Sequence, residues 1–256
     1  MRYEHRLRTA GRVVTPLVRP LLVGPGDAAP PPPFVFPSEN LIFALDPTQN
    51  ITAAGGAVSA WGPANPGSDL STLTGTATLV PAGPGGAAYV SFDGASDRLG
   101  PVGPDWGTMT EQTLYLTARV RSLADGVDQL IIDGESRFAG AIIAYSSGAG
   151  GYDAPSIWPI FGGNVDFTVP LTVGAWFVLC LRMRGDATSD VGVNLGAPVA
   201  GDAGGGGMRG LTLGAAADGV EHCACDIGPL GLYGGVHGDA TRLAIMTGLM
   251  AARGIS

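Results

Sequence analysis

The sequence predicts an all-β domain, an antiparallel two-sheet jelly-roll sandwich with one C-terminal helix and an extended N-terminal arm. Three observations support this fold class. Short apolar or alternating runs recur along the chain and end at tight-turn signals. The 42 glycines and 20 prolines among 256 residues supply those turns. Only residues 240–253 show convincing helical spacing, so the alternation of strands and helices that parallel-sheet enzymes need is absent.

Residues 1–37 are predicted to form a basic, proline-rich anchoring arm and linker, and residues 38–256 the jelly-roll domain. Within residues 1–26, a single glutamate faces five arginines, which we expect to anchor the arm to a partner and which give a net charge of +4: Arg2, Arg6, Arg8, Arg12 and Arg19. Recurring prolines remove backbone donors, so the arm should neither fold alone nor join the sheet. Interleaved aliphatic residues favour docking on a partner over the alternative, a solvated tail.

The rest of the chain is acidic, with nine arginines against 21 acidic residues and a net charge of −12. This charge disfavours nucleic-acid binding, which needs clustered cations. No apolar run reaches the roughly 18 residues of a membrane span. We therefore expect a soluble protein with no nucleic-acid partner and no membrane span.

The first predicted strands are 41–45, 76–80, 88–92 and 113–120. The first is apolar on both faces, which predicts a central strand, and it ends at the turn former Asp46-Pro47. The second alternates threonine with apolar residues, and the third ends at Asp93-Gly94. The fourth alternates strictly and predicts a half-buried antiparallel strand, with one face on a core and the other facing solvent or a second layer.

Later strands are predicted at 130–132, 141–145, 176–183, 191–195, 211–213 and 223–233, most of them closed by glycine-containing turns. In all, about ten to twelve strands are expected. The helix should begin with Asp239 as its cap and end at Gly254. It should press one apolar face onto the sandwich through residues at helical spacing: Leu243, Met246, Leu249 and Met250.

From about residue 40 onward, the order of these segments resembles the concanavalin A-like lectin and glucanase superfamily, in particular its laminin-G-like jelly rolls. The resemblance is carried by the first strand with Asp46, Trp61, the segment Tyr89–Leu99, the strand Gly174–Leu181, and the final strand Ile227–Tyr233 with its helix ending at Gly254-Ile255. It is greatest to the versions of this domain in bacteriophage and phage-like particle proteins, where a short anchor precedes the jelly roll.

This resemblance implies a non-catalytic virion or phage-like particle protein, such as a head spike, fibre, decoration or tail component. The arm would bind other particle proteins, and the jelly roll would bind host-surface polysaccharide at the particle surface as a homo-oligomer. The alternatives are a polysaccharide-degrading enzyme of the same fold or a bacterial surface adhesin. Family members that hydrolyse glucans carry a Glu-x-Asp-x-x-Glu strand, which this chain lacks, so no enzymatic activity is expected. The acidic pairs Asp125 with Asp128 and Asp133 with Glu135 lie in turn-like surroundings, so we expect them to be solvated caps of turns.

Sugar-binding residues are sought among loop aromatics with neighbouring acids, because aromatic rings stack on sugars and carboxylates accept their hydroxyl hydrogen bonds. The predicted carbohydrate-binding residues are Asp105, Trp106, Tyr145, Tyr152, Asp153 and Trp158, the last four from one polar, glycine-rich loop. The alternative is that these aromatics plug the ends of the core.

Calcium is the one cofactor considered, with Asp93 and Asp97 as oxygen ligands. The alternative is that Asp93 only forms its turn. A zinc site from Cys180, Cys223, Cys225 and His237 can be drawn, but three small buried hydrophobic residues are the favoured interpretation of these cysteines.

Overall fold

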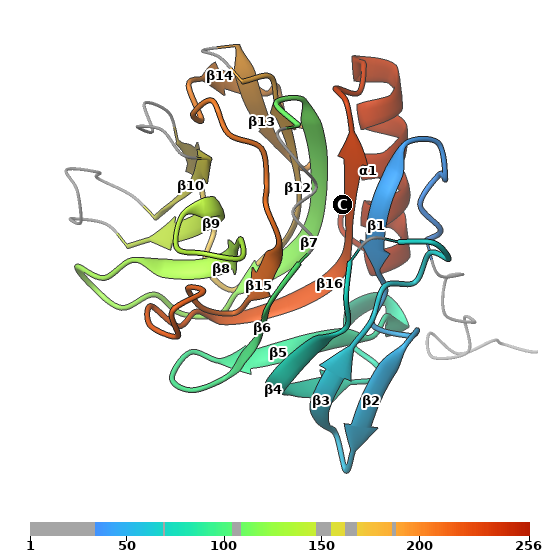
Figure 1. The fold of residues 1–256 in the computed structure, drawn as a ribbon, viewed down its shortest axis with the longest axis vertical. Helices are drawn as coiled ribbons and strands as arrows, with labels where there is room; N and C mark the ends of the chain where they lie inside the picture. Colours follow the sequence, from blue (N-terminus) through green and yellow to red (C-terminus); the bar gives the residue numbers. More distant parts are fainter. Residues whose placement is uncertain (1–33, 69, 104–108, 147–154, 162–167, 186–187) are drawn as a thin grey trace, which may run out of the picture.

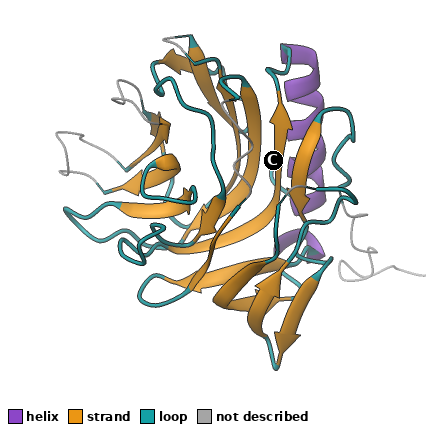
Figure 2. Ribbon diagram, in the orientation of Figure 1, coloured by secondary structure: helices purple, strands orange, loops and turns teal. Residues whose placement is uncertain are grey.

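The computed structural model describes residues 34–68, 70–103, 109–146, 155–161, 168–185 and 188–256. It is all-β with one α-helix, which lies against one side of the strands (Figure 2). The strands are β1 (Leu41–Leu45), β2 (Ile51–Ala54), β3 (Ala57–Trp61), β4 (Leu73–Val80), β5 (Tyr89–Asp93), β6 (Arg98–Val102), β7 (Gln112–Val120), β8 (Gln129–Asp133), β9 (Ala139–Tyr145), β10 (Ser156–Phe161), β11 (Val169–Pro170), β12 (Trp176–Met183), β13 (Ser189–Val193), β14 (Val199–Gly201), β15 (Leu211–Leu213) and β16 (Ala224–Gly234). The helix is α1 (Asp239–Arg253).

Thirteen strands form one antiparallel path in the order β11-β10-β9-β8-β15-β6-β4-β5-β16-β7-β12-β13-β14. Strand β4 joins the two halves, because its last residues pair with β5 and Gly75 and Thr76 pair with β6. In Figure 1 the path curves round until β10 faces β13, so that the sheet is nearly closed. The prediction of an all-β antiparallel fold with a C-terminal helix is thus confirmed.

The main core draws apolar side chains from both halves of this path. One half contributes Val90, Phe92, Leu114, Leu116, Leu179 and Leu181, and the other contributes Ile131, Ile132, Ile142, Leu211 and Leu213. Trp61 is fully buried among them, and its indole N–H donates to the carbonyl oxygen of Asp46 at 3.2 Å. Every second side chain of a strand points to the same face, so the apolar residues of these strands meet in one core.

Helix α1 covers the opposite face of β7 and β12 (Figure 1). Tyr115 and Val178 lie under Ile245 and Met246 in a second apolar cluster. Of the two alternatives for the outer face of β7, solvent or a second layer, the structure shows the second layer, and β7 is buried on both faces. Within the helix, Met246, Leu249 and Met250 are buried as expected, but Leu243 is 39% exposed.

Two further details differ from the sequence-based expectations. Strand β1 pairs with β16 alone among the described residues, so it is not a central strand; its two apolar faces are explained by the main core on one side and the helix cluster on the other. The helix N-cap is Gly238 without a side-chain cap hydrogen bond, and Asp239 is instead its first residue.

Residues 34–37 of the predicted arm lie against the domain. Phe36 is 8% exposed and packs in the helix cluster. The rings of Phe34 and Phe36 pack edge to face, with their centroids 5.1 Å apart. The anchoring arginines lie outside the described residues, so the division into arm and domain stays a prediction. No helix in the described part of the chain is long and apolar enough to cross a membrane.

Candidate functional site

Of the six predicted carbohydrate-binding residues, the structure describes two. Asp105, Trp106, Tyr152 and Asp153 lie outside the described residues. Tyr145 and Trp158 are described, and both belong to strands: Tyr145 ends β9, and Trp158 lies on β10. The expectation that Trp158 lies in a loop is therefore wrong, because β10 continues the sheet beside β9.

Tyr145 and Trp158 form an aromatic pair on adjacent strands. Their ring centroids are 4.1 Å apart and tilted by 39°. Tyr145 is opposite Ser156 in the register, so Trp158 lies diagonally across from it on the same face. Tyr145 is 9% exposed, and Trp158 is half-buried. Tyr145 is thus packed into the domain, while part of the Trp158 side chain stays accessible.

The face that carries this pair is the one turned away from the main core, and we call it the outer face of β8–β10. Its floor consists of Leu130, Ala141, Ile143, Tyr145 and Ala216, with Phe138 and Trp158 packed against them. The Ser156 hydroxyl beside Tyr145 is buried without a hydrogen-bond partner. The outer face is therefore an apolar platform with a buried floor, and Phe138 and Trp158 are its half-buried, accessible part.

A charged cluster borders this platform. The Arg137 guanidinium lies over the Phe138 ring, 5.0 Å from its centroid. The same guanidinium pairs with Glu221 and with Asp218, the latter at 3.5 Å between Nη1 and Oδ2. The backbone fixes this arrangement, since Leu130 N–H donates to the Glu221 carbonyl oxygen at 3.0 Å. One arginine thus holds two carboxylates together at the edge of the aromatic platform.

Asp133, at the end of β8, positions the two loops that bring these groups together. Its Oδ1 accepts hydrogen bonds from the backbone N–H groups of Gly134 and Phe138, and its Oδ2 accepts one from Ala217, each at 2.9 Å. The side chain is fully buried. It therefore ties the loop after β8 to the loop before β16. The expectation that Asp133 is a solvated turn residue is wrong for this reason.

The two carboxylates held by Arg137 differ in exposure. The Glu221 side chain is 16% exposed and that of Asp218 is 47% exposed. Burial raises the pKa of Glu221 above its ordinary value; the Arg137 guanidinium opposes this, and the negative charges of Asp128 and Asp218 add to it. The Oε2 atom of Glu221 is buried without a hydrogen-bond partner. Glu221 is thus the carboxyl group suited to carry a proton, while Asp218 is solvated.

This combination can bind a ring with polar edges and can transfer a proton to it. Aromatic faces stack on apolar ring surfaces, and carboxylates accept hydroxyl hydrogen bonds. A protonated carboxyl group beside an ionised one is the pattern of general acid catalysis. Sequence reasoning missed Arg137, Asp218 and Glu221, because they come from loops more than 80 positions apart and no local spacing links them.

Asp93 and Asp97, the predicted calcium ligands, lie in one exposed turn. The Oδ1 atom of Asp93 accepts the backbone N–H groups of Ala95, Ser96 and Asp97, each at 2.8 Å. Burial opposes ionisation, but these hydrogen bonds dominate and lower the pKa of Asp93. The Asp93 oxygens already serve the turn, and no group of three potential ligand side chains occurs among the described residues. The residues therefore do not fit calcium, and the turn-forming alternative accounts for them.

The three cysteines are buried and free, and Cys180 lies apart from Cys223 and Cys225. Cys223 and Cys225 point into the main core, whereas Cys180 lies on the other side of the sheet beneath α1. His237 contacts Tyr115 there, with 2.9 Å between the Tyr115 hydroxyl and Nδ1. This separation excludes the zinc site and agrees with the favoured interpretation of small buried hydrophobic residues.

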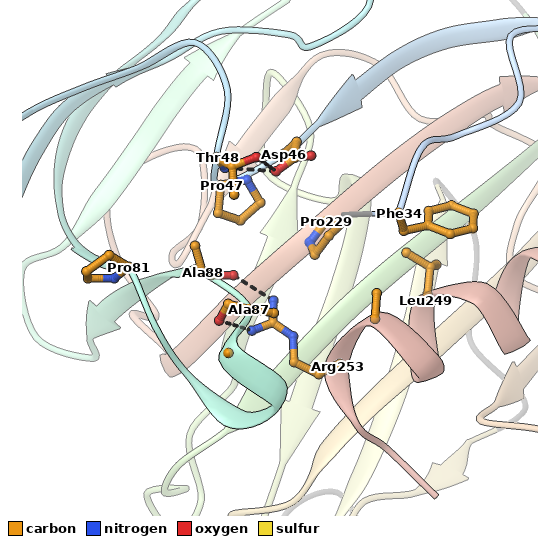
Figure 3. Close-up of a pocket in the computed structure, with 12 residues that line it drawn as sticks. Phe34, Asp46, Pro47, Thr48, Pro81, Ala87, Ala88, Pro229, Leu249 and Arg253 are labelled. Atoms are coloured by element: carbon orange, nitrogen blue, oxygen red, sulfur yellow. Dashed lines mark hydrogen bonds between the residues drawn. The ribbon is translucent and has the colours of Figure 1, made fainter. Parts of the chain in front are cut away.

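An apolar pocket of about 270 Å³ lies on the helix side, between Phe34, Pro229 and Leu249 (Figure 3). Its polar groups are satisfied internally. Arg253 donates to the carbonyl oxygens of Ala87 and Ala88 at 2.9 and 2.7 Å, and Asp46 accepts from Thr48. The pocket offers surface for packing but no free reactive group.

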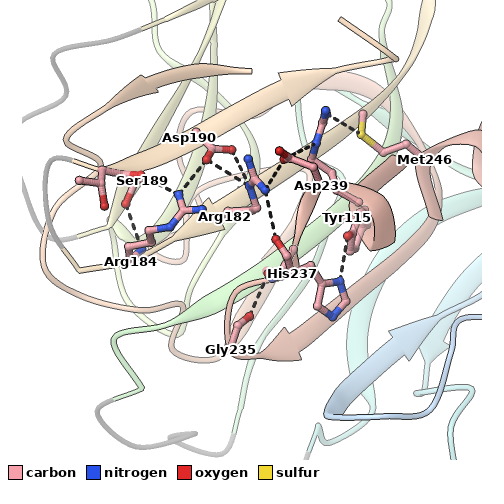
Figure 4. Close-up of polar contacts among 12 residues, drawn as sticks. Tyr115, Arg182, Arg184, Ser189, Asp190, Gly235, His237, Asp239 and Met246 are labelled. Carbon is pink, nitrogen blue, oxygen red and sulfur yellow. Dashed lines mark hydrogen bonds and ion pairs between the residues drawn. The ribbon is translucent and has the colours of Figure 1, made fainter. Parts of the chain in front are cut away.

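A second polar cluster joins β12 to the start of α1 (Figure 4). Arg182 is buried and donates from Nε to Asp190 at 2.8 Å and from Nη1 to Asp239 at 2.7 Å and to the His237 carbonyl oxygen. Arg184 pairs with the other oxygen of Asp190. Each charge has a partner, so this network fixes the helix on the sheet. The outer face of β8–β10 remains the best candidate site.

Comparison with known proteins finds solved structures with a similar fold. No family model and no curated protein sequence matches the chain. An arabinofuranosidase complexed with arabinofuranosyl-alpha-1,2-xylobiose has a similar structure, with a TM-score of 0.60 and 13% identity over 84% of this chain and 60% of that one. A Trypanosoma rangeli sialidase in complex with sialic acid has a TM-score of 0.53 and 16% identity, over 84% of this chain and 34% of the sialidase chain. The binding domain of Paraclostridial Mosquitocidal Protein 1 has a TM-score of 0.57 and 10% identity, over 82% of this chain and 52% of that one.

The chain thus spans 60% or less of the length of these proteins, and the likeness concerns the fold. It nevertheless corrects the functional expectation. The resemblance to phage particle proteins led us to expect a non-catalytic structural protein, but the fold is similar to parts of two carbohydrate-cleaving enzymes, 60% of one chain and 34% of the other. This comparison contradicts the prediction of a non-catalytic virion component and the prediction of no enzymatic activity, and it agrees better with the alternative of a polysaccharide-degrading enzyme.

Proposed function

We propose that this chain is a carbohydrate-cleaving domain that binds a saccharide on the outer face of β8–β10. The observation that carries the proposal is the continuity of the stacked Tyr145–Trp158 pair with the two carboxylates held by Arg137. The shared fold with an arabinofuranosidase and a sialidase supports it. We also favour the two-sheet form of the concanavalin A-like superfamily, since the main core draws on both halves of the strand path.

The proposed chemistry divides the two carboxylates by their surroundings. Glycosidases use two carboxyl groups about 5 to 9.5 Å apart, one protonated and one ionised. Two carboxylates that share one guanidinium fall within about 10 Å of each other, which suits such a pair. Glu221, with its raised pKa, would donate a proton to the leaving oxygen, and the more exposed Asp218 would act as nucleophile or base. Arg137 would position both groups.

Hydrolysis of a panel of nitrophenyl glycosides, arabinofuranosides included, tests the proposal. Glu221→Gln keeps the shape but removes the acid, so we expect the rate on the best substrate to fall by about 10²-fold or more. Trp158→Ala should raise KM more than it lowers kcat, because stacking is uniform binding. Glu39→Gln, beside His237 near the start of α1, is the charge-matched control and should leave the rate unchanged. A Glu221→Gln protein with the wild-type rate would exclude Glu221 as the acid, and saccharide binding without cleavage by wild type would contradict the catalytic part.

A further inference from the structure

We infer that the outer face of β8–β10 selects neutral saccharides and rejects those that carry a carboxylate. The inference rests on the proposed function and adds the substrate class. The two enzymes that share the fold differ in this respect, since the complex of one contains an arabinofuranosyl-xylobiose and that of the other contains sialic acid. The charges around the platform decide between these two kinds of sugar.

Negative charge predominates at the edge of the platform. Asp128, Asp218 and Asp133 all lie near enough to Glu221 for their charges to raise its pKa. Even when Glu221 holds a proton, Asp128 and Asp218 outnumber the single guanidinium of Arg137, which already pairs with Glu221 and Asp218. An incoming carboxylate would meet this surplus of negative charge.

The other arginines around the two loops are also engaged. Arg98 donates from Nη1 to the Ala217 carbonyl oxygen at 2.9 Å, beneath the loop before β16. Arg209 pairs with Glu135 at 3.5 Å. In the described part of this region, every guanidinium therefore already has a protein partner.

Recognition of a carboxylate normally uses an arginine that is free to bind both oxygens. To capture an acidic sugar here, Arg137 would have to leave Glu221 or Asp218 unpaired, and like charges brought together at a binding surface cost several kcal/mol. Neutral sugar hydroxyls do not incur this cost, because carboxylates accept their hydrogen bonds. The site is therefore built for uncharged rings.

Calorimetric binding to size-matched pairs tests the inference: lactose against sialyllactose, and xylotriose against glucuronic acid-substituted xylotriose. We expect the wild-type protein to bind the neutral member of a pair at least about tenfold more tightly. Equal affinity, or a preference for the acidic member, would overturn the inference and leave the proposed function intact. Binding of neither member of either pair would overturn both.

A double variant provides the complementary test. Asp218→Asn with Glu221→Gln releases Arg137, so affinity for the acidic members should rise and the preference should shrink to less than about threefold. Adding Arg137→Met should abolish that gain. The control double variant, Glu39→Gln with Glu111→Gln, changes the net charge by the same amount but near the loop that precedes α1. This control should keep the preference for neutral sugars. A gain of acidic-sugar binding in this control, or none in the double variant, would show that local pairing of Arg137 does not set the specificity.

Discussion

Replacing Asp133 by alanine should destabilise the protein strongly, because this buried carboxylate holds both loops of the candidate site. It accepts three backbone N–H groups, from Gly134, Phe138 and Ala217, at 2.9 Å each. A buried donor left without a partner costs about 1 to 3 kcal/mol. Because the loops can partly relax, we expect Asp133→Ala to lower the free energy of unfolding by about 4 kcal/mol. Asp133→Asn can still serve Gly134 and Phe138 and should lose about 1 to 3 kcal/mol.

Urea unfolding at neutral pH, followed by tryptophan fluorescence, measures these differences. Asp93→Ala is the matched control, since Asp93 also accepts three backbone N–H groups but lies in an exposed turn where water can replace it. It should cost about 1 kcal/mol or less. If Asp133→Ala costs less than about 1 kcal/mol, or no more than Asp93→Ala, the carboxylate does not organise the loops as argued.

Three further outcomes are expected. Arg182→Met removes the main partner of buried Asp190 and should cost about 3 kcal/mol in urea unfolding. Burial lowers the pKa of His237, so as the pH falls below about 6.5 the unfolded state takes up a proton before the folded state does, and the protein becomes less stable. His237→Gln should therefore weaken the fall in stability between about pH 7.5 and pH 5. Deleting residues 1–33 should leave the unfolding midpoint unchanged, whereas deleting residues 1–37 removes two packed phenylalanines and should cost about 3 kcal/mol.

Local patterns in the sequence predicted much of the fold. The bounds of β1 and β12 match the predicted ranges 41–45 and 176–183, and α1 begins one residue earlier than predicted. These elements could be predicted because apolar periodicity and turn residues act within a few positions. The hairpin of β2 and β3 was missed, since Ile51–Ala54 and Ala57–Trp61 are short and rich in alanine. The burial of both faces of β7 could not be predicted locally, because it depends on where the helix packs.

The candidate site was predicted only in its aromatic part. Tyr145 and Trp158 stood out as aromatics in a glycine-rich stretch, and the sheet brings them together. The charged part needs Arg137, Asp218 and Glu221 to meet across the fold, and only the tertiary structure brings their loops together.

The position of β16 and α1 has a consequence for how the protein is made. Strand β16 pairs with β1, β5 and β7, and α1 covers the face of β7 and β12. A ribosome synthesises both elements after every strand that depends on them. Earlier strands therefore emerge with unpaired edges and bare apolar surface, the condition in which nascent chains aggregate or recruit chaperones. Truncated translation products that stop before residue 224 should accordingly be found in the insoluble fraction.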